Sequence, residues 1–313
     1  MKKKKNLYSV IIPVYKSENI LTETLISTVN SLNKHKLNYE IILVDDNSPD
    51  KVWQIIKDFS KNNKKITGLR FIKNFGQHTA ILCGFEHAKG DYIITMDDDM
   101  QNPPSEIIKL INKAHEGYDL VFGKYKEKRH ALYRKIGTKL VGYLNKKIFQ
   151  KPENISLTNF RIIHKSIIDR LLSYKTVYPY IPGLVLMFAT NIANTEVVHM
   201  PRKNGKSNYS FFKIIQLISR ILFNYSTFPL KFIIAIGFII ASISFSVSVF
   251  FIVRSFFTKA VVPGWTSIVV ILSFFQGISL LILGMLGEYI GRLVIQQSKG
   301  KSYHLKDSVN LHD

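Results

Sequence analysis

The sequence predicts an α/β fold with a mostly parallel sheet, followed by an amphipathic interfacial helix and two transmembrane helices. Three observations support this prediction. Strand-like apolar runs alternate with helical segments over the first two-thirds of the chain, and acidic clusters end two of these runs. Further along, two segments of roughly 20 residues or more contain no ionisable side chain.

Strands and helices alternate from residue 9 to residue 99 in the order typical of βαβ units. The predicted order is strand SVIIPVY, helix Glu18–Lys34, strand YEIILVDD, helix Asp50–Asn63, strand GLRFIK, helix His78–Ala88 and strand DYIITMDDD. Continuous apolar strands such as Ile41–Val44 and Tyr92–Met96 indicate a parallel sheet that is covered on both faces.

Carboxylates gather where two of these strands end, Asp45-Asp46 after one and Asp97-Asp98-Asp99 after another. Ligands of open α/β sheets bind beyond the carboxyl ends of the strands. Three adjacent carboxylates repel one another, which a fold tolerates most readily when a divalent cation neutralises them; the alternative is a solvated loop. Oxygen ligands without Cys or His favour Mg²⁺ or Mn²⁺ bridging to a diphosphate. The chain has no P-loop motif and no dinucleotide fingerprint.

Two apolar segments, residues 232–253 and 260–287, are each long enough to cross a hydrocarbon core, the alternative being buried core helices. Lysine and arginine flank both outer ends, so the positive-inside rule places these ends and the N-terminal part in the cytoplasm. The predicted organisation is a cytosolic domain over residues 1–209, an amphipathic interfacial or surface helix over 210–228, a two-helix transmembrane hairpin over 229–292 and a basic cytosolic tail over 293–313.

Composition excludes several classes of protein. Forty-three Lys and Arg against 22 Asp and Glu give a formal net charge of +21, which favours an anionic partner. The hydrophobic fraction of 46% excludes a wholly disordered chain, and a single cysteine, Cys83, excludes a disulfide scaffold and a zinc-finger protein. A nucleic-acid binder would explain the charge but neither the apolar segments nor the acidic strand ends, so no nucleic-acid partner is expected.

Four motifs occur in a characteristic order along the chain. They are Val10–Tyr15 with Glu18, then Val44–Ser48, then Lys73–Gln77, and then Asp97–Pro104. Together they resemble the family 2 glycosyltransferases of GT-A fold. More narrowly, the chain from about Tyr8 to about Arg292 resembles the polyprenyl-phosphate glycosyltransferases. That group includes bactoprenol glucosyltransferase, dolichol-phosphate mannose synthase and undecaprenyl-phosphate 4-deoxy-4-formamido-L-arabinose transferase.

The resemblance implies a nucleotide-sugar site and a metal site at the acidic strand ends. The implied nucleotide-sugar residues are Pro13, Tyr15, Glu18, Asp46 and Asp97, with Asp46 accepting hydrogen bonds from the base or ribose. Asp99 and Gln101 would hold Mg²⁺ or Mn²⁺, which stabilises the departing nucleoside diphosphate as a Lewis acid. Asp98 is expected to turn away from the metal.

The resemblance also implies a set of acceptor residues. Those expected to grip the lipid phosphate are Arg134 with Thr138, Arg202 with Ser207, and Lys128; the implied catalytic residues are Asp97, Asp99 and Arg134. Two positions depart from the family pattern. Tyr125 stands where many relatives have an arginine, and Asn159 stands where bactoprenol glucosyltransferases have an aspartate proposed as a base.

The predicted function is therefore inverting transfer of a sugar from a nucleotide-sugar, with UDP favoured by the resemblance, to undecaprenyl phosphate. We expect it at the cytoplasmic face of the inner membrane, in cell-envelope glycan synthesis or lipid A modification. A phosphate monoester is largely dianionic at neutral pH and needs no strong base. The Gly- and Ser-bearing apolar segments and the resemblance favour a homo-oligomer. The alternatives are a non-catalytic membrane-anchored nucleotide-sugar-binding scaffold and a polysaccharide synthase, although the usual Gln-x-x-Arg-Trp motif of such synthases is missing.

Overall fold

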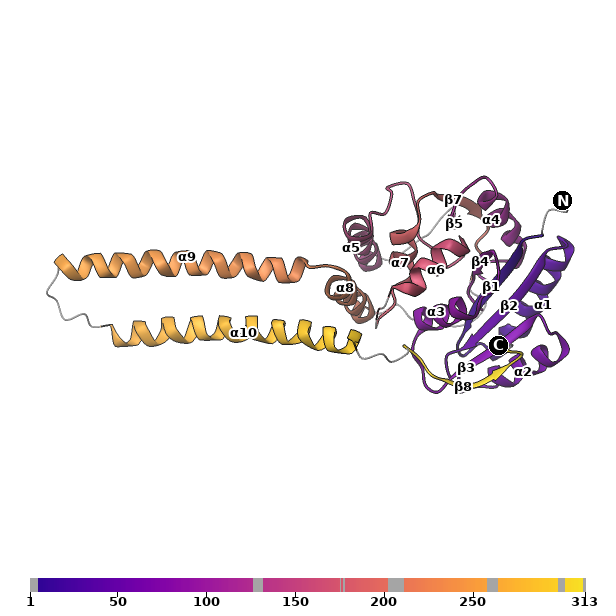
Figure 1. The fold of residues 1–313 in the computed structure, drawn as a ribbon, viewed down its shortest axis with the longest axis horizontal. Coiled ribbons are helices and arrows are strands. Elements are labelled where there is room, and N and C mark those ends of the chain that lie inside the picture. Colours follow the sequence, from indigo (N-terminus) through magenta and orange to yellow (C-terminus); the bar gives the residue numbers. More distant parts are fainter. Residues whose placement is uncertain are drawn as a thin grey trace. The chain divides into compact units, whose positions relative to one another are not determined.

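The computed structural model describes residues 5–125, 132–174, 176, 178–201, 211–257, 264–297 and 302–311. The chain divides into two compact units. The first comprises residues 1–216 and 300–313, and the second comprises residues 217–299. The first unit contains the sheet, and the second contains a pair of long helices (Figure 1).

An eight-stranded sheet with the order β7-β5-β6-β4-β1-β2-β3-β8 forms the centre of the first unit. Its strands are β1 (Leu7–Val14), β2 (Asn38–Asp45), β3 (Ile66–Phe71), β4 (Tyr92–Thr95), β5 (Leu120–Tyr125), β6 (Arg161–His164), β7 (Ile192–Val197) and β8 (Leu305–Val309). Strands β3, β2, β1 and β4 run parallel, β6 is antiparallel to both β4 and β5, and β8 is antiparallel to β3. The expected mostly parallel α/β sheet is confirmed.

Helices cover both faces of this sheet. They are α1 (Glu18–Lys34), α2 (Val52–Asn62), α3 (Gln77–His87), the 3₁₀ turn η1 (Pro104–Glu106), α4 (Ile107–Ala114), α5 (Leu132–Phe149), α6 (Lys165–Ser173) and α7 (Ile181–Phe188). Helices α1, α2 and α4 contribute to one core together with β1, β2 and β4, whereas α3 packs on the opposite face of β1 and β2. The three helices predicted up to residue 88 are confirmed within two residues at each end.

Close packing of α3 on β1 fixes the position of the central strand. Gly84 of α3 faces Ile11, and a Cβ atom at this position would lie 2.4 Å from Cγ2 of Ile11. Ile11 is fully buried, as are its neighbours Val10 and Ile12. The β1 backbone is thus held from both faces, and the loop that follows it starts from a rigid point.

The C-terminal residues form a sheet strand rather than only a basic tail. Strand β8 pairs with β3, and the Trp53 indole nitrogen donates to Asp307 over 3.0 Å. Just before the strand, the Tyr303 hydroxyl donates to Glu86 over 2.5 Å. Just after it, the Asn310 side chain donates to the carbonyls of Ser60, Asn63 and Ile66. The sequence LKDSV has little apolar character, so hydropathy does not indicate this strand.

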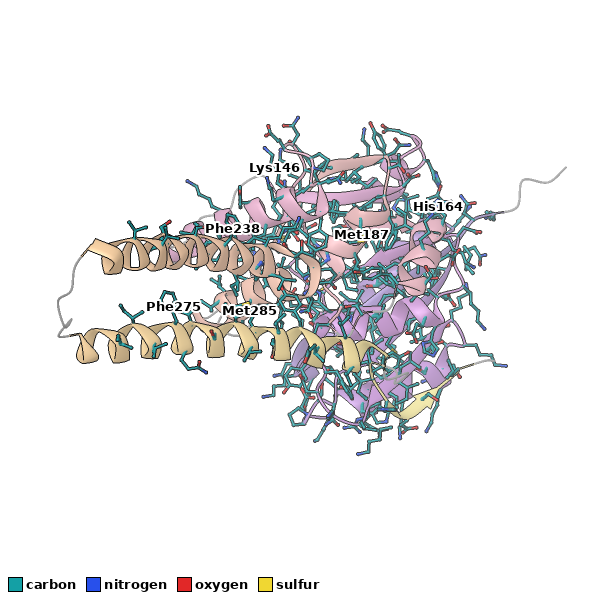
Figure 2. All side chains as sticks on the ribbon, turned by 60° about the vertical axis from the view of Figure 1, so that its left-hand side comes forward. Lys146, His164, Met187, Phe238, Phe275 and Met285 are labelled. Carbon is teal, nitrogen blue, oxygen red and sulfur yellow. The ribbon has the colours of Figure 1, made fainter. Side chains whose placement is uncertain are left out.

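The second unit consists of the end of α8 (Phe211–Tyr225), α9 (Phe228–Phe257) and α10 (Trp265–Gln297). The predicted apolar segment 232–253 lies within α9, and most of 260–287 lies within α10. Large apolar side chains are exposed along both helices: Phe238, labelled in Figure 2, is 75% exposed, and Leu272 and Leu283 are more than half exposed.

The described helices support membrane spans less strongly than the apolar segments of the sequence do. Over the described residues, none of the helices taken singly is long and apolar enough to cross a membrane. One bent pair, Ile214–Tyr225 with Phe228–Ile239 at 83° to each other, meets the requirement by length and composition. The transmembrane hairpin therefore stays a prediction.

The Asn310 contacts predict a measurable stability effect of the chain end. Asn310→Ala removes hydrogen bonds to three carbonyls and places alanine at φ 55°, so we expect a loss of about 2 kcal/mol in the free energy of unfolding. Asn310→Gly removes the same hydrogen bonds without backbone strain and should lose less. Denaturant unfolding of the detergent-purified full chain measures both, with the exposed Leu311→Ala as control; equal stability of all three variants would contradict the capping role.

Candidate active site

The sheet order places the ends of β1, β2 and β4 side by side. Strand β1 pairs in parallel with β2 on one side and β4 on the other, with Pro13 opposite Val44 and Ile11 opposite Thr95. The residues that follow these strands therefore meet at one edge of the sheet. Tyr15, Asp46 and Asp97, which the sequence analysis assigned to the nucleotide-sugar site, all lie in these three loops.

Four loops at this edge turn through residues with left-handed backbone conformation. They are Lys16 (φ 56°), Asn47 (φ 55°), Gly76 (φ 92°) and Met100 (φ 58°). For residues such as lysine and methionine this conformation costs about 1–2 kcal/mol. Such strain persists where the surrounding structure fixes it, and it gathers at functional sites.

Asp46 connects the loop after β2 to the loop after β3. Its two carboxylate oxygens accept hydrogen bonds from the backbone N–H groups of Phe75 and Gly76, at 2.6 and 2.8 Å. Burial raises the pKa of Asp46 to about 6 against the effect of these two bonds, with the charge of Asp45 contributing. Since each carboxylate oxygen can accept a second bond, Asp46 can still bind a base or ribose.

Asp97 is held by side chains from two other parts of the chain. Its Oδ1 atom accepts from the side-chain amides of Gln77, at 2.6 Å, and Asn159, at 3.3 Å. Burial and the Asp99 charge raise the pKa of Asp97 to about 6, although the two amide bonds and the charge of Arg161 act in the opposite direction. Both amides hold the carboxylate in one orientation at the edge of the sheet.

Asp98 faces the loop after β1. Its Oδ2 atom accepts from the Tyr15 backbone N–H at 3.2 Å, and its carbonyl accepts from the Thr24 hydroxyl at 3.0 Å. Burial raises the pKa of Asp98 to about 6, with hydrogen bonding to Ser17 acting against the shift. The middle carboxylate thus joins the acidic loop to the Tyr15 loop, and its expected turn away from the metal stays a prediction.

Asp99 and Gln101, the predicted metal ligands, occupy one tight turn. The Gln101 N–H donates to Asp99 Oδ1 at 3.1 Å, and the Gln101 carbonyl accepts from the Met200 N–H at 2.8 Å. Among the described residues there is no cluster of three or more His, Cys, Asp or Glu side chains able to enclose a metal ion. Asp99 and Gln101 carry oxygen donors, the ligand type that Mg²⁺ and Mn²⁺ prefer, and their role as metal ligands stays a prediction.

The other two predicted nucleotide-site residues have structural contacts. Pro13 is buried within β1. Glu18 accepts from the Lys51 N–H at 3.0 Å and donates its own N–H to Asp50 at 3.2 Å. Glu18 therefore fixes the loop after β2 from the side of α1.

The predicted acceptor residues lie mostly outside the described structure. Arg134 and Thr138 belong to the first half of α5, four positions apart and thus on one side of the helix. Lys128, Arg202 and Ser207 lie outside the described residues.

Three residues to which the sequence analysis assigned no site role contact or face the acidic loop. Gln77 and Asn159 bind Asp97, as described above. Tyr125 stacks on His199 with ring centroids 4.1 Å apart, and burial followed by the charge of Asp97 raises its pKa above the usual value for tyrosine. The motifs around Gln77 and Asn159 had marked these positions, but no local pattern shows that their side chains meet one carboxylate.

The model of the Glycosyl transferase family 2 matches residues 9–172, more than half of the chain. The chain belongs to this family. It is 35% identical over 294 residues to an undecaprenyl-phosphate 4-deoxy-4-formamido-L-arabinose transferase of Aeromonas hydrophila, covering 92% of this chain and 89% of that protein. It is 34% identical over 291 residues to the protein of the same name from Proteus mirabilis, with the same coverage. The predicted family and the prediction of a glycosyltransferase are thus confirmed.

A solved structure with the same fold is glucosyl-3-phosphoglycerate synthase of Mycobacterium tuberculosis, crystallised with Mn²⁺, UDP and phosphoglyceric acid. The match has a TM-score of 0.51 at 15% identity and covers 70% of this chain and 76% of that one. At this level of identity the match supports the GT-A fold alone.

The raised pKa values of Asp97 and Asp98 predict a stability that falls with pH. Both carboxyl groups have a pKa of about 6 in the folded chain against the ordinary aspartate value of 3.8. Between about pH 4 and pH 6 the folded chain therefore binds more protons than the unfolded chain, so its stability decreases as pH rises and stays lower above about pH 6.

Asp97→Asn removes one of these charges while its carbonyl oxygen can still accept from both amides. We expect its melting temperature without divalent cations to exceed that of the parent by roughly 2–4 °C at about pH 7.5 and to equal it at about pH 4. The exposed Asp169→Asn is the control and should shift neither value. An Asp97→Asn variant that is less stable at the higher pH would refute the electrostatic explanation.

Proposed function

We propose that this glycosyltransferase moves a sugar from a nucleotide-sugar, with UDP as the favoured nucleotide, to a polyprenyl phosphate such as undecaprenyl phosphate. The observation that carries the proposal is the meeting of the Tyr15, Asp46 and Asp97–Asp99 loops at one sheet edge, in a chain that matches named undecaprenyl-phosphate transferases over 92% of its length. The donor is placed over this edge, with Tyr15 and Asp46 toward the nucleoside.

The donor half of the proposal draws support from the related fold that binds UDP with Mn²⁺. Asp99 and Gln101 would hold Mg²⁺ or Mn²⁺, whose charge stabilises the leaving nucleoside diphosphate. Asp97, oriented by Gln77 and Asn159, faces the ribose and the diphosphate. The hydrogen bond between Asp98 and Tyr15 holds the acidic loop next to the loop after β1. The binding sites for the base and for the diphosphate would therefore stay at a fixed distance from each other.

The proposed lipid-phosphate acceptor is supported by the names of the two relatives and by the exposed apolar helices of the second unit. Helices α9 and α10 expose large apolar side chains along their length, which suits a lipid environment better than water. We place them in the inner membrane as a multi-pass hairpin, with the sheet unit on the cytoplasmic side. Arg134 with Thr138, Arg202 with Ser207, and Lys128 supply cations and hydroxyls for the lipid phosphate. The enzyme is proposed to act in cell-envelope glycan synthesis or lipid A modification, as a homo-oligomer.

The proposed reaction is a direct displacement with inversion. A lipid-phosphate oxygen forms a bond to the anomeric carbon while the bond from that carbon to the nucleoside diphosphate breaks, and the diphosphate leaves with the electron pair. The phosphate is already a dianion near neutral pH. Asn159 therefore need not take a proton, and its amide is used instead to hold Asp97.

The test is conversion of radiolabelled undecaprenyl phosphate to a glycosylated lipid by the purified full chain, with a panel of UDP-sugars and Mg²⁺ or Mn²⁺. We expect one donor to give product and Asp99→Ala to abolish it. Product of retained configuration would refute inversion. UDP binding without turnover of any donor, including formamido sugars, would favour a nucleotide-sugar-binding scaffold, and a chain that binds neither UDP nor GDP would refute the donor site.

Asn159→Asp separates the two roles that position 159 can have. A carboxylate there would lose the 3.3 Å bond to Asp97 and add repulsion, so we expect kcat to fall about tenfold or more above pH 7. If a missing base limits the reaction, the same variant would instead be faster than the parent. Asn159→Ala, which loses the bond without adding charge, should lie between the parent and Asn159→Asp.

A further inference from the structure

Arg161 is a fully buried arginine behind the acidic loop, and nothing above assigns it a role. It is the first residue of β6, directly opposite Thr95 on β4 and Phe122 on β5. Its guanidinium carbon lies 6.0 Å from the centre of the Phe122 ring. Two residues after Thr95 the chain reaches Asp97, so the arginine lies beside the end of the strand from which the carboxylate cluster continues.

The hydrogen bonding of Arg161 is incomplete. Its Nε atom donates to the Thr95 hydroxyl at 3.1 Å. Within the part of the chain that the structure describes, neither Nη1 nor Nη2 has a hydrogen-bond partner, and no carboxylate forms an ion pair with either. Burial lowers the pKa of Arg161 to about 10, which still leaves the side chain charged at neutral pH. An unpaired buried charge is destabilising, so a fold retains it at a cost.

The charge that Arg161 faces is that of Asp97. Each group shifts the other's pKa toward its ionised form. They are also linked by hydrogen bonds, because the Thr95 hydroxyl that accepts from Arg161 donates to the Asn159 carbonyl at 2.5 Å, and the Asn159 amide donates to Asp97. The arginine thus supports Asp97 both by charge and through the residue that orients it.

We propose that Arg161 is a positioning residue whose buried charge serves the donor site, offsetting the charge of the acidic loop and of the incoming nucleoside diphosphate. Because none of the described carboxylates neutralises it at contact distance, its field extends to the sheet edge where the diphosphate binds. Its position below the loop keeps this charge out of water and fixed before the donor arrives. This inference rests on the proposed function, since it requires a nucleoside diphosphate at Asp97–Asp99.

The decisive experiment compares UDP affinity with stability in Arg161→Met. Methionine can fill much of the same buried space without a charge, and the change removes an unpaired buried charge rather than one partner of an ion pair among the described residues. We expect an unchanged or higher melting temperature, together with UDP binding about tenfold weaker by calorimetry. The loss should be larger without added metal than with Mn²⁺, since the metal offsets part of the same negative charge. Lipid-phosphate KM should stay unchanged while donor KM rises.

Two further variants complete the test. Arg161→Lys keeps the charge and should bind UDP within a few-fold of the parent, whereas Arg161→Gln, which keeps a polar group only, should resemble Arg161→Met. Arg170→Met, an exposed arginine on α6, is the matched control and should change neither property. If Arg161→Met does not fold, the comparison of Arg161→Lys with Arg161→Gln tests the proposal instead. Equal UDP affinity of these two variants would overturn it.

The inference and the proposed function can fail separately. A parent chain that binds no UDP refutes the proposed function, whatever the variants do. A parent that binds UDP, with Arg161→Met binding equally well, refutes only the role of Arg161. An Arg161→Met chain that folds but melts far below the parent, with UDP affinity restored by stabilising conditions, shows a purely structural arginine.

Discussion

Repulsion among carboxylates at one edge of the sheet is the constraint on which the rest of this structure depends. The parallel order of β4, β1 and β2 brings Asp45, Asp46 and Asp97–Asp99 to the same edge. Three of these carboxylates are each compensated in a different way. Asp45 pairs with Arg70 at 3.1 Å, Asp46 accepts two backbone N–H groups, and Asp97 accepts two side-chain amides. These contacts also hold the loops together. The interactions that compensate the negative charges therefore fix the geometry of the site as well.

Much of the fold could be predicted because its elements have strong local patterns. Helix α1 and the apolar strands β1 and β2 are long and periodic, and they were found within a residue or two. Strand β8 was missed because its pairing partner β3 lies far away in the sequence and its own residues are polar. A strand at a sheet edge needs little hydrophobicity when side chains such as Tyr303 and Asn310 anchor its ends.

The candidate site could be predicted from the sequence only in part. Residues on the acidic strand ends follow from composition and topology, since the carboxyl ends of parallel strands meet at one edge. The contacts of Gln77 and Asn159 with Asp97 depend on α3 and on the segment before β6 approaching the same carboxylate from different directions. No spacing within the sequence contains that information. The sequence did not single out Arg161, because burial and missing hydrogen-bond partners are properties of the folded chain.

Strand β8 also bears on how the protein is made. The sheet that carries the site is completed by residues synthesised after the helical hairpin, and Trp53 meets Asp307 across 254 residues of chain. A nascent chain can therefore build β1 to β7 early, but it leaves the outer edge of β3 unpaired until β8 has been synthesised. A strand whose backbone N–H and C=O groups are unpaired along one side can form a sheet with another chain. Strand β8 thus closes that edge only after both apolar helices have been synthesised, so completion of the sheet unit follows synthesis of the second unit.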